Sequence, residues 1–219
     1  MGKIKVIAIM GKAGSGKDTL LKNFIKLKEN KYHFVYDGKK HHIVYDEIFD
    51  EKYNIVIPFT TRPMREGEEQ DKTYHFLPEE NIGELIESGV VAQVTDFRGW
   101  LYGFLWDDFK EDKINIGIFT PRAINYLMDY VDLDITPVYI MATDKERLIR
   151  QLDREENPDI KEIIRRYGTD EEDFDEKELK YLPSIIRLEN HSDDDEEINV
   201  NMFYQLTCKF IDIVDNWTN

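Results

Sequence analysis

A short glycine-rich segment near the start of the chain constrains the fold more than any other feature. It reads Gly11-Lys12-Ala13-Gly14-Ser15-Gly16-Lys17, and it lies between an apolar, β-branched run at 3–10 and a stretch with helical spacing of apolar residues at 18–27. The pattern Gly-x-x-x-x-Gly-Lys between a strand and a helix is typical of a loop that binds phosphate groups. Glycines let such a loop turn its N–H groups towards phosphate oxygens, next to the positive end of the helix. The segment therefore predicts a nucleoside triphosphate site in an α/β fold.

Eight residues in this loop and at the start of the helix are candidate ligands of ATP and Mg²⁺. Lys17 is expected to neutralise the β- and γ-phosphates and to act in catalysis. Asp18 stands where a Ser or Thr commonly follows the lysine, and Thr19 comes one place later, so these two are the candidate magnesium ligands, directly or through water. A glycine turn that only caps a helix is the alternative. The candidate ATP-binding residues are Gly11, Ala13, Gly14, Ser15, Gly16, Lys17, Asp18 and Thr19.

The rest of the chain alternates strand and helix patterns. Apolar runs predict buried strands at 113–119, 136–141 and 184–188, and helical spacing predicts helices at 121–130, from 144 onwards and at 198–217. Between the first helix and residue 113 we expect a hairpin at 32–45, strands at 55–59, 90–95 and 101–104, and a helix at 78–88. This alternation predicts an α/β fold with a mostly parallel sheet and helices on both faces.

The charge balance and the cysteine count narrow the classes of partner. Acidic residues outnumber basic ones by 45 to 29, which gives a formal charge of −16. Nucleic acid is disfavoured as a partner, because its attraction needs a basic face. The single cysteine, Cys208, allows no intramolecular disulfide, is typical of a reducing cytoplasmic compartment, and is expected in the core. The N-terminus lacks a signal-peptide pattern and no run approaches about 20 apolar residues, so we expect no membrane partner.

A second segment, residues 60–76, carries a specific resemblance. It contains Thr60-Thr61-Arg62, a second arginine at Arg65, Gly67-Glu68 and the run Tyr74-His75-Phe76. In this combination and spacing it resembles the guanylate kinase family. The resemblance implies a kinase that transfers the γ-phosphoryl group of ATP to a (deoxy)nucleoside monophosphate, GMP, dGMP or another base. It extends over nearly the whole chain, from the phosphate loop to an arginine-rich helix.

The resemblance implies a phosphate-binding role for four residues of the acceptor side. Arg62, Arg65 and Tyr74 would hold the phosphate of the acceptor, and Tyr102, in a Leu-Tyr-Gly strand, would complete the cluster. Arginine forks grip phosphate in a bidentate manner, and tyrosine hydroxyls donate hydrogen bonds without adding charge. The alternative is that both arginines pair with nearby acidic residues on a solvated loop.

The resemblance also implies catalytic arginines in a helical lid. Arg154 and Arg166 lie near the arginines of the family's lid, with Arg150 and Arg165 as competing choices. Cations closing over the transferred phosphoryl group would stabilise its charge. A surface ion pair is the alternative for each of them.

The family's layout gives expected boundaries for one domain over 1–219. The core would comprise 1–30 and 110–219, with a hairpin insertion at about 31–53, an acceptor-binding β region at about 54–109 and the lid at about 150–178. The connection between Lys17 and Thr60 is long for the family, and the hairpin is expected to be the inserted piece, which offers contacts for a possible homodimer.

Two departures from the family pattern concern the base and the metal. Gln93 stands where the family has an acidic residue that reads guanine, and an amide suits adenine, thymine or cytosine edges better than guanine's adjacent donors. We therefore expect altered or relaxed base choice, with Gln93 as a substrate-binding residue. The other guanine-reading places hold Pro58, Phe104 and Phe119; Phe97, Trp100 and Phe104 are candidate stacking surfaces, and Phe119 is expected in the core.

The acidic end of a strand, typical of the family, is replaced by residues 116–122, which carry no carboxylate. Magnesium would then be held by ATP phosphates, water and the phosphate loop, with Arg122 adding positive charge. These losses also support a rival interpretation, a guanylate-kinase-like module that binds a phosphorylated or acidic protein segment without catalysis. A P-loop ATPase or a kinase for another small acceptor is a second rival.

Overall fold

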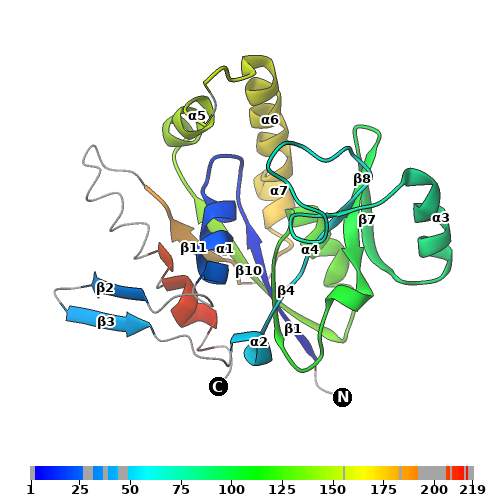
Figure 1. Cartoon of the computed structure of the whole chain (residues 1–219), viewed down its shortest axis with the longest axis horizontal. Helices are drawn as coiled ribbons and strands as arrows, with labels where there is room; N and C mark the ends of the chain where they lie inside the picture. The colour runs from blue at the N-terminus through cyan, green and yellow to red at the C-terminus, as the bar shows by residue number, and fades with distance from the viewer. Residues whose placement is uncertain are drawn as a thin grey trace. The chain divides into compact units, whose positions relative to one another are not determined.

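A computed structural model of the chain describes residues 3–26, 32–36, 39–43, 49–154, 156–182, 184–191, 206–207, 209–214 and 216 (Figure 1). The chain divides into two compact units, Met1–Ala8 with Lys52–Ile135 and Ile9–Glu51 with Thr136–Asn219. In the described part of the chain no helix combines the length and apolar character needed to cross a membrane.

The largest sheet has five strands in the order β11-β10-β1-β9-β4. These are β11 (Ile186–Glu189), β10 (Leu133–Met141), β1 (Ile4–Met10), β9 (Ile114–Ile118) and β4 (Tyr53–Ile55). Strands β10 and β11 pair in parallel from Val138 opposite Ile186, and β4 pairs in parallel with β9 from Tyr53 opposite Ile114. Five consecutive residues of β1, 6–10, have no exposed surface, as expected for a central strand covered on both faces. The predicted α/β fold with a mostly parallel sheet is confirmed.

In the unit of residues 9–51 and 136–219, helices follow the strands. Helix α1 (Lys17–Lys26) buries Phe24, whose ring packs 5.2 Å from that of Phe49 in α2 (Phe49–Lys52) and edge-on to Phe210 at 5.4 Å. Residues 206–207, 209–214 and 216 are helical, in agreement with the predicted C-terminal helix. The region expected as a lid, about 150–178, contains the end of α5 (Asp144–Leu152), all of α6 (Ile160–Asp173) and most of α7 (Glu176–Leu179). The predicted hairpin is confirmed as β2 (Tyr32–Tyr36) antiparallel to β3 (Lys39–Ile43).

The unit of residues 1–8 and 52–135 holds a four-stranded sheet in the order β6-β5-β8-β7. Its strands are β6 (His75–Phe76), β5 (Phe59–Thr60), β8 (Trp100–Leu105) and β7 (Val91–Phe97). Strands β7 and β8 form a hairpin whose turn residues, Arg98 and Gly99, have φ of 60° and 76°, as a tight two-residue hairpin turn requires. Helix α3 (Glu79–Glu87), a short 3₁₀ turn at Trp106–Asp108 and α4 (Pro121–Leu127) complete the unit.

One strand prediction was wrong. Residues 55–59 were expected to form a single strand, but β4 ends at Ile55 and β5 begins at Phe59, in different sheets. Pro58 lies between them and has no N–H to continue a ladder, while its carbonyl accepts a hydrogen bond from His75 N–H at 2.9 Å. Cys208, which is expected in the core, lies outside the described residues.

Candidate active site

The glycine-rich loop connects β1 to α1. Gly14 and Gly16 have φ of 78° and 93°, in the left-handed region that glycine adopts without a steric penalty. A Cβ atom on Gly14 would lie 2.5 Å from the carbonyl oxygen of Arg147 in α5, so the helix backbone packs directly against the loop. The sequence pattern thus has a local structural cause, since only glycine fits this contact.

Three successive carbonyl groups of the loop are held by side chains. In a trans peptide the carbonyl and the following N–H point in opposite directions. Because side chains hold the carbonyl groups, the N–H groups of Gly14 and Gly16 point away from those side chains. This is the arrangement that a phosphate cradle needs. The donors are Arg147 Nε to Ala13 at 3.1 Å, Arg150 Nη1 to Gly14 at 3.3 Å and Asn190 Nδ2 to Ser15 at 2.7 Å.

Arg150 therefore has a defined place in the structure. Its Nη2 also donates to the carbonyl of Asn190 at 3.0 Å, which links α5 to the residue after β11 behind the loop. Burial lowers the pKa of Arg150 below its ordinary value. Arg150 was a competing choice for a catalytic arginine, and in this structure its guanidinium is engaged with backbone carbonyls instead.

The predicted cation and magnesium ligands lie at the first turn of α1. The Nζ of Lys17 is 3.4 Å from Asp18 Oδ2, and the side chains of Asp18 and Thr19 are exposed. An exposed carboxylate and hydroxyl at a helix start suit a hydrated magnesium ion bound to a nucleotide. In the described ranges, no group of three or more His, Cys, Asp or Glu side chains is arranged to hold a metal ion by itself.

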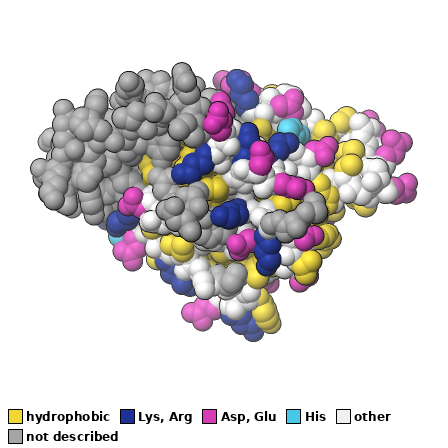
Figure 2. All heavy atoms as spheres, turned by 90° about the horizontal axis from the view of Figure 1, so that it is seen from below, with side chains coloured by type: hydrophobic (Ala, Val, Ile, Leu, Met, Phe, Trp, Pro, Cys, Tyr) yellow, Lys and Arg dark blue, Asp and Glu magenta, His cyan; other side chains and the backbone are white. Residues whose placement is uncertain are grey.

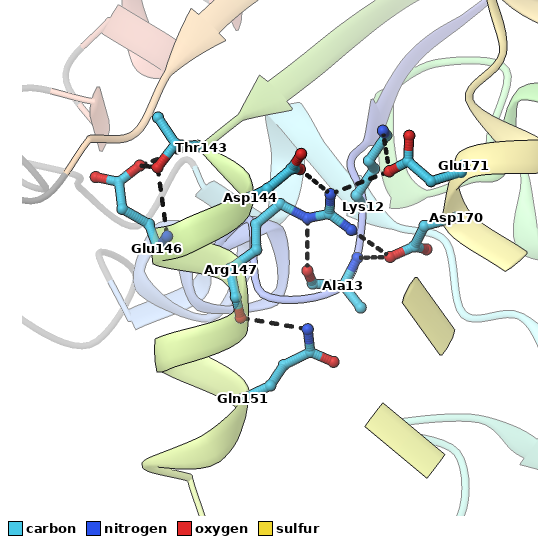
Figure 3. A network of polar contacts seen from close by, with 9 residues as sticks. All are labelled: Lys12, Ala13, Thr143, Asp144, Glu146, Arg147, Gln151, Asp170 and Glu171. Carbon is cyan, nitrogen blue, oxygen red and sulfur yellow. Dashed lines mark hydrogen bonds and ion pairs between the residues drawn. The ribbon is translucent and has the colours of Figure 1, made fainter. Parts of the chain in front are cut away.

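Arg147 is the most buried charged side chain of this unit, with 1% of its surface exposed. Its Nη2 lies 2.8 Å from Asp170 Oδ2 in α6, and its Nη1 lies 2.8 Å from Asp144 Oδ1 and 3.4 Å from Glu171 Oε1 (Figure 3). Its guanidinium also lies 4.9 Å from the centre of the Tyr167 ring. Arg147 is not among the site residues predicted from the sequence, because an arginine in a highly charged helix is usually exposed.

The acceptor loop in the other unit is organised by Arg62. This side chain is 6% exposed and forms a bidentate ion pair with Glu68, with Nη1–Oε2 at 2.7 Å and Nη2–Oε1 at 2.5 Å. Hydrogen bonding to Arg62 lowers the pKa of Glu68 and raises that of Arg62. Glu68 also accepts a hydrogen bond from the Arg65 N–H at 2.8 Å, while the Arg65 side chain is exposed. The pairing with an acidic residue that was weighed as the alternative is present for Arg62.

The two predicted tyrosines lie beside Arg62. Its guanidinium is 5.0 Å from the centre of the Tyr74 ring, and the rings of Tyr74 and Tyr102 meet edge to face at 6.3 Å. Tyr102 lies on β8 opposite Thr60 of β5 and Thr95 of β7. The structure thus brings Arg62, Tyr74 and Tyr102 together, with Arg65 attached through Glu68.

Gln93 is buried next to this cluster. It is 5% exposed, and its Nε2 donates to Thr95 Oγ1 on the same face of β7. Phe104 and Phe119 are 4% and 3% exposed, and their rings stack at 4.3 Å. The expectation that Phe119 lies in the core is confirmed, whereas Phe104 offers no free stacking surface because Phe119 covers it. Trp100 is 39% exposed.

The predicted lid arginines differ in their surroundings. Arg154 is exposed in the turn after α5. On α6, Arg165 and Arg166 share one carboxylate, because Glu162 Oε1 accepts from Arg166 Nε at 2.9 Å and from Arg165 Nη2 at 2.5 Å. These bonds lower the pKa of Glu162 to about 2. Both arginines are therefore held by the same acidic side chain.

His75 joins the acceptor loop to the turn after β8. Its Nδ1 lies 2.7 Å from Asp71 Oδ1 and its Nε2 lies 3.1 Å from Asp108 Oδ1. Burial opposes protonation of the ring, but the hydrogen bonds and charges of the two carboxylates raise the pKa of His75 above its ordinary value. In the sequence His75 is only the middle residue of the Tyr-x-Phe run, and its contacts with Asp71 and Asp108 were not predicted.

Comparison with known proteins agrees with this geometry. The family model described as guanylate kinase matches residues 37–195, which is more than half of the chain. This chain belongs to the guanylate kinase family. It is 30% identical to a guanylate kinase of Prochlorococcus marinus over 193 residues, covering 86% of each chain, and 26% identical to one of Helicobacter hepaticus, covering 74% of this chain and 72% of the relative.

The fold of this family is also found by comparison with solved structures. The crystal structure of guanylate kinase from Anaplasma phagocytophilum superposes with a TM-score of 0.51 and 16% sequence identity, covering 95% of this chain and 87% of the other. At this identity the likeness supports the guanylate kinase fold and leaves the substrate to be argued from the residues.

Proposed function

We propose that this member of the guanylate kinase family is a nucleoside monophosphate kinase. It would transfer the γ-phosphoryl group of ATP to a (deoxy)nucleoside monophosphate, either GMP or dGMP or a monophosphate of another base. ATP would supply the phosphoryl group, and magnesium would neutralise its phosphate charges.

The observation that carries this proposal is the anchored phosphate loop. Side chains from α5 and from the residue after β11 hold the carbonyls of Ala13, Gly14 and Ser15, and Lys17 begins the following helix. Positioning donors for phosphate in advance is the main contribution that a protein makes to phosphoryl transfer. A module that had lost nucleotide chemistry would have no use for this network, so the loop favours the kinase over the binding module.

The residues of the acceptor side support a phosphate as the second ligand. Arg62, Arg65, Tyr74 and Tyr102 would bind the acceptor phosphate, with Glu68 holding the Arg62 guanidinium over the Tyr74 ring. Arg154 and Arg166 would supply positive charge to the transferred group, and Asp18 and Thr19 would hold magnesium through water. Gln93 would contact the base.

A panel assay tests the proposal. ATP and magnesium are supplied with each ribo- and deoxynucleoside monophosphate in turn, and release of ADP is measured. We expect turnover that requires one or more monophosphates and falls at least about a hundredfold in Lys17→Ala, because a cation on the β- and γ-phosphates is lost. Turnover that does not exceed that of this variant with any acceptor would contradict the kinase and favour the binding module. ATP hydrolysis without dependence on an acceptor would favour an ATPase.

The same panel decides the choice of base. Gln93 offers one acceptor and one donor, and its Nε2 is oriented by Thr95, so we expect turnover of monophosphates other than those of guanine. Exclusive turnover of GMP and dGMP would show that base choice follows the family in spite of Gln93.

A further inference from the structure

Arg147 ties the phosphate loop to helix α6 through a closed set of hydrogen bonds. The Ala13 N–H donates to Asp170 Oδ2 at 2.7 Å, and the same oxygen accepts from Arg147 Nη2 at 2.8 Å. Arg147 Nε returns to the Ala13 carbonyl at 3.1 Å (Figure 3). Both backbone polar groups of one loop residue are therefore held by a single ion pair, in which Arg147 is buried and Asp170 is partly exposed.

A second ion pair lies beside the first. Lys12 Nζ is 2.5 Å from Glu171 Oε1, so two adjacent loop residues are joined to two adjacent residues of α6. A buried guanidinium is stable only when carboxylates compensate its charge, and Asp144 and Glu171 would still do so if Asp170 were neutralised. The contact can therefore be weakened at Asp170 without leaving Arg147 unpaired.

The place of Asp170 on α6 also bears on the two neighbouring lid arginines, Arg165 and Arg166. Arg166 precedes Asp170 by four residues and lies on the same side of α6. Arg165 lies about 100° further round the helix, away from the side that carries Tyr167 and Asp170. Arg166, but not Arg165, therefore lies on the side of α6 that carries Asp170, which distinguishes these two candidate lid arginines.

We propose that Asp170 is a positioning residue for the triphosphate. It fixes the peptide groups of Ala13, the N–H directly and the carbonyl through Arg147, and it holds α6 so that Arg166 rather than Arg165 supplies charge to the transferred phosphoryl group. This inference rests on the proposed function in taking ATP as the phosphoryl donor.

The variant Asp170→Asn tests the positioning role. It keeps the size of the side chain but removes the charge that pairs with Arg147, and we expect the KM for ATP to rise about tenfold, the loss of one hydrogen bond to a charged group. The KM for the monophosphate should stay within about twofold, since nothing on the acceptor side changes, and Asp170→Glu should recover part of the affinity for ATP. A purely structural role would shift both KM values or lower the urea midpoint of unfolding instead.

The matched control is Glu172→Gln on the same helix. Glu172 is exposed, so the variant removes one carboxylate from α6 without touching the loop. We expect its KM for ATP to equal that of the unchanged protein. Equal effects of Asp170→Asn and Glu172→Gln would mean that only the general charge of α6 matters, and would overturn the proposal.

Direct binding of ATP separates this inference from the proposed function. Calorimetric titration with ATP and magnesium should give a Kd about tenfold higher for Asp170→Asn than for the unchanged protein, whether or not any monophosphate is phosphorylated. Equal Kd values would overturn the positioning role even in an active kinase. For the arginines, turnover should fall more in Arg166→Gln than in Arg165→Gln, and the reverse order would overturn the assignment of Arg166.

Discussion

Gly103 is a residue whose role follows from geometry alone. A Cβ atom at this position would lie 2.1 Å from the carbonyl oxygen of Gln93 and 2.6 Å from the ring of Phe59. These two neighbours come from the strands on either side of β8, so neither can move without disturbing the sheet. Glycine follows Tyr102 because the strand next to the acceptor cluster has no room for a side chain there.

The variant Gly103→Ala should therefore destabilise the protein. We expect the free energy of unfolding to fall by about 1–3 kcal/mol, since an extra methyl group is forced against backbone. Urea denaturation followed by tryptophan fluorescence measures this change. Gly83, in helix α3, is the matched control because an added Cβ meets nothing within 4 Å, and Gly83→Ala should stabilise by about 0.5–1 kcal/mol. Equal effects of the two variants would contradict the packing argument.

Residues of the candidate site could be predicted from the sequence only where a pattern is local. The glycines, Lys17 and the Arg62–Tyr74 segment were found because their spacing is fixed within one loop. Arg147 was missed because its partners are remote in the chain: Ala13 lies 134 residues before it and Asp170 lies 23 residues after it. No short-range pattern separates such a buried arginine from the exposed ones around it.

At the scale of elements, the strands of the largest sheet were predicted well from their apolar runs. Strand β1 is buried over residues 6–10 and β9 over 114–117, whereas β10 extends beyond the predicted 136–141 to Leu133 and includes the exposed Asp134. The run at 55–59 misled because it is split between two sheets at Pro58. The Val56 N–H donates to the carbonyl of Ile116, whereas the Pro58 carbonyl accepts from the His75 N–H, so neighbouring residues bond to different strands. These partners are remote in the chain, and the sequence alone does not identify them.

Helix α6 contains an ion-pair cluster with a testable pH dependence. Arg165 first and Arg166 second lower the pKa of Glu162 from 4.5 to about 2. Since the folded pKa lies below the unfolded one, the cluster stabilises the folded chain above about pH 4.5, and its contribution is lost as the pH falls towards 2. The side chains are partly exposed, so salt should reduce the effect.

Titration of the Glu162 carboxyl group by carbon NMR measures this shift. We expect a midpoint near 2 in the unchanged protein and a return towards 4.5 in Arg165→Gln that is larger than in Arg166→Gln. A Glu162 midpoint at the ordinary value in the unchanged protein would show that the cluster does not form in solution.

At the scale of the whole molecule, charge is the dominant feature. The formal charge is −16, and Figure 2 shows basic side chains interspersed among acidic ones over the described part of one face. A chain with this excess repels itself when compact, and the repulsion is relieved on unfolding. Yet the proposed site would bind anions through local groups, since Lys17 and the anchored loop would act within a few ångströms. Stability and ligand binding should therefore respond to salt in opposite directions.

This opposition gives the last prediction. Raising NaCl from about 0.01 M to about 0.3 M shortens the screening length from about 30 Å to less than 10 Å, so self-repulsion over the surface is largely removed. We expect the urea midpoint of unfolding to rise, whereas the Kd for ATP should increase because the attraction of Lys17 for the phosphates is screened. KCl at equal ionic strength is the control for the stability measurement, because screening depends on ionic strength and not on the identity of the salt. A urea midpoint that falls with NaCl would mean that ion pairs such as Lys12–Glu171 and Arg62–Glu68 contribute more to the folded state than the net charge takes away.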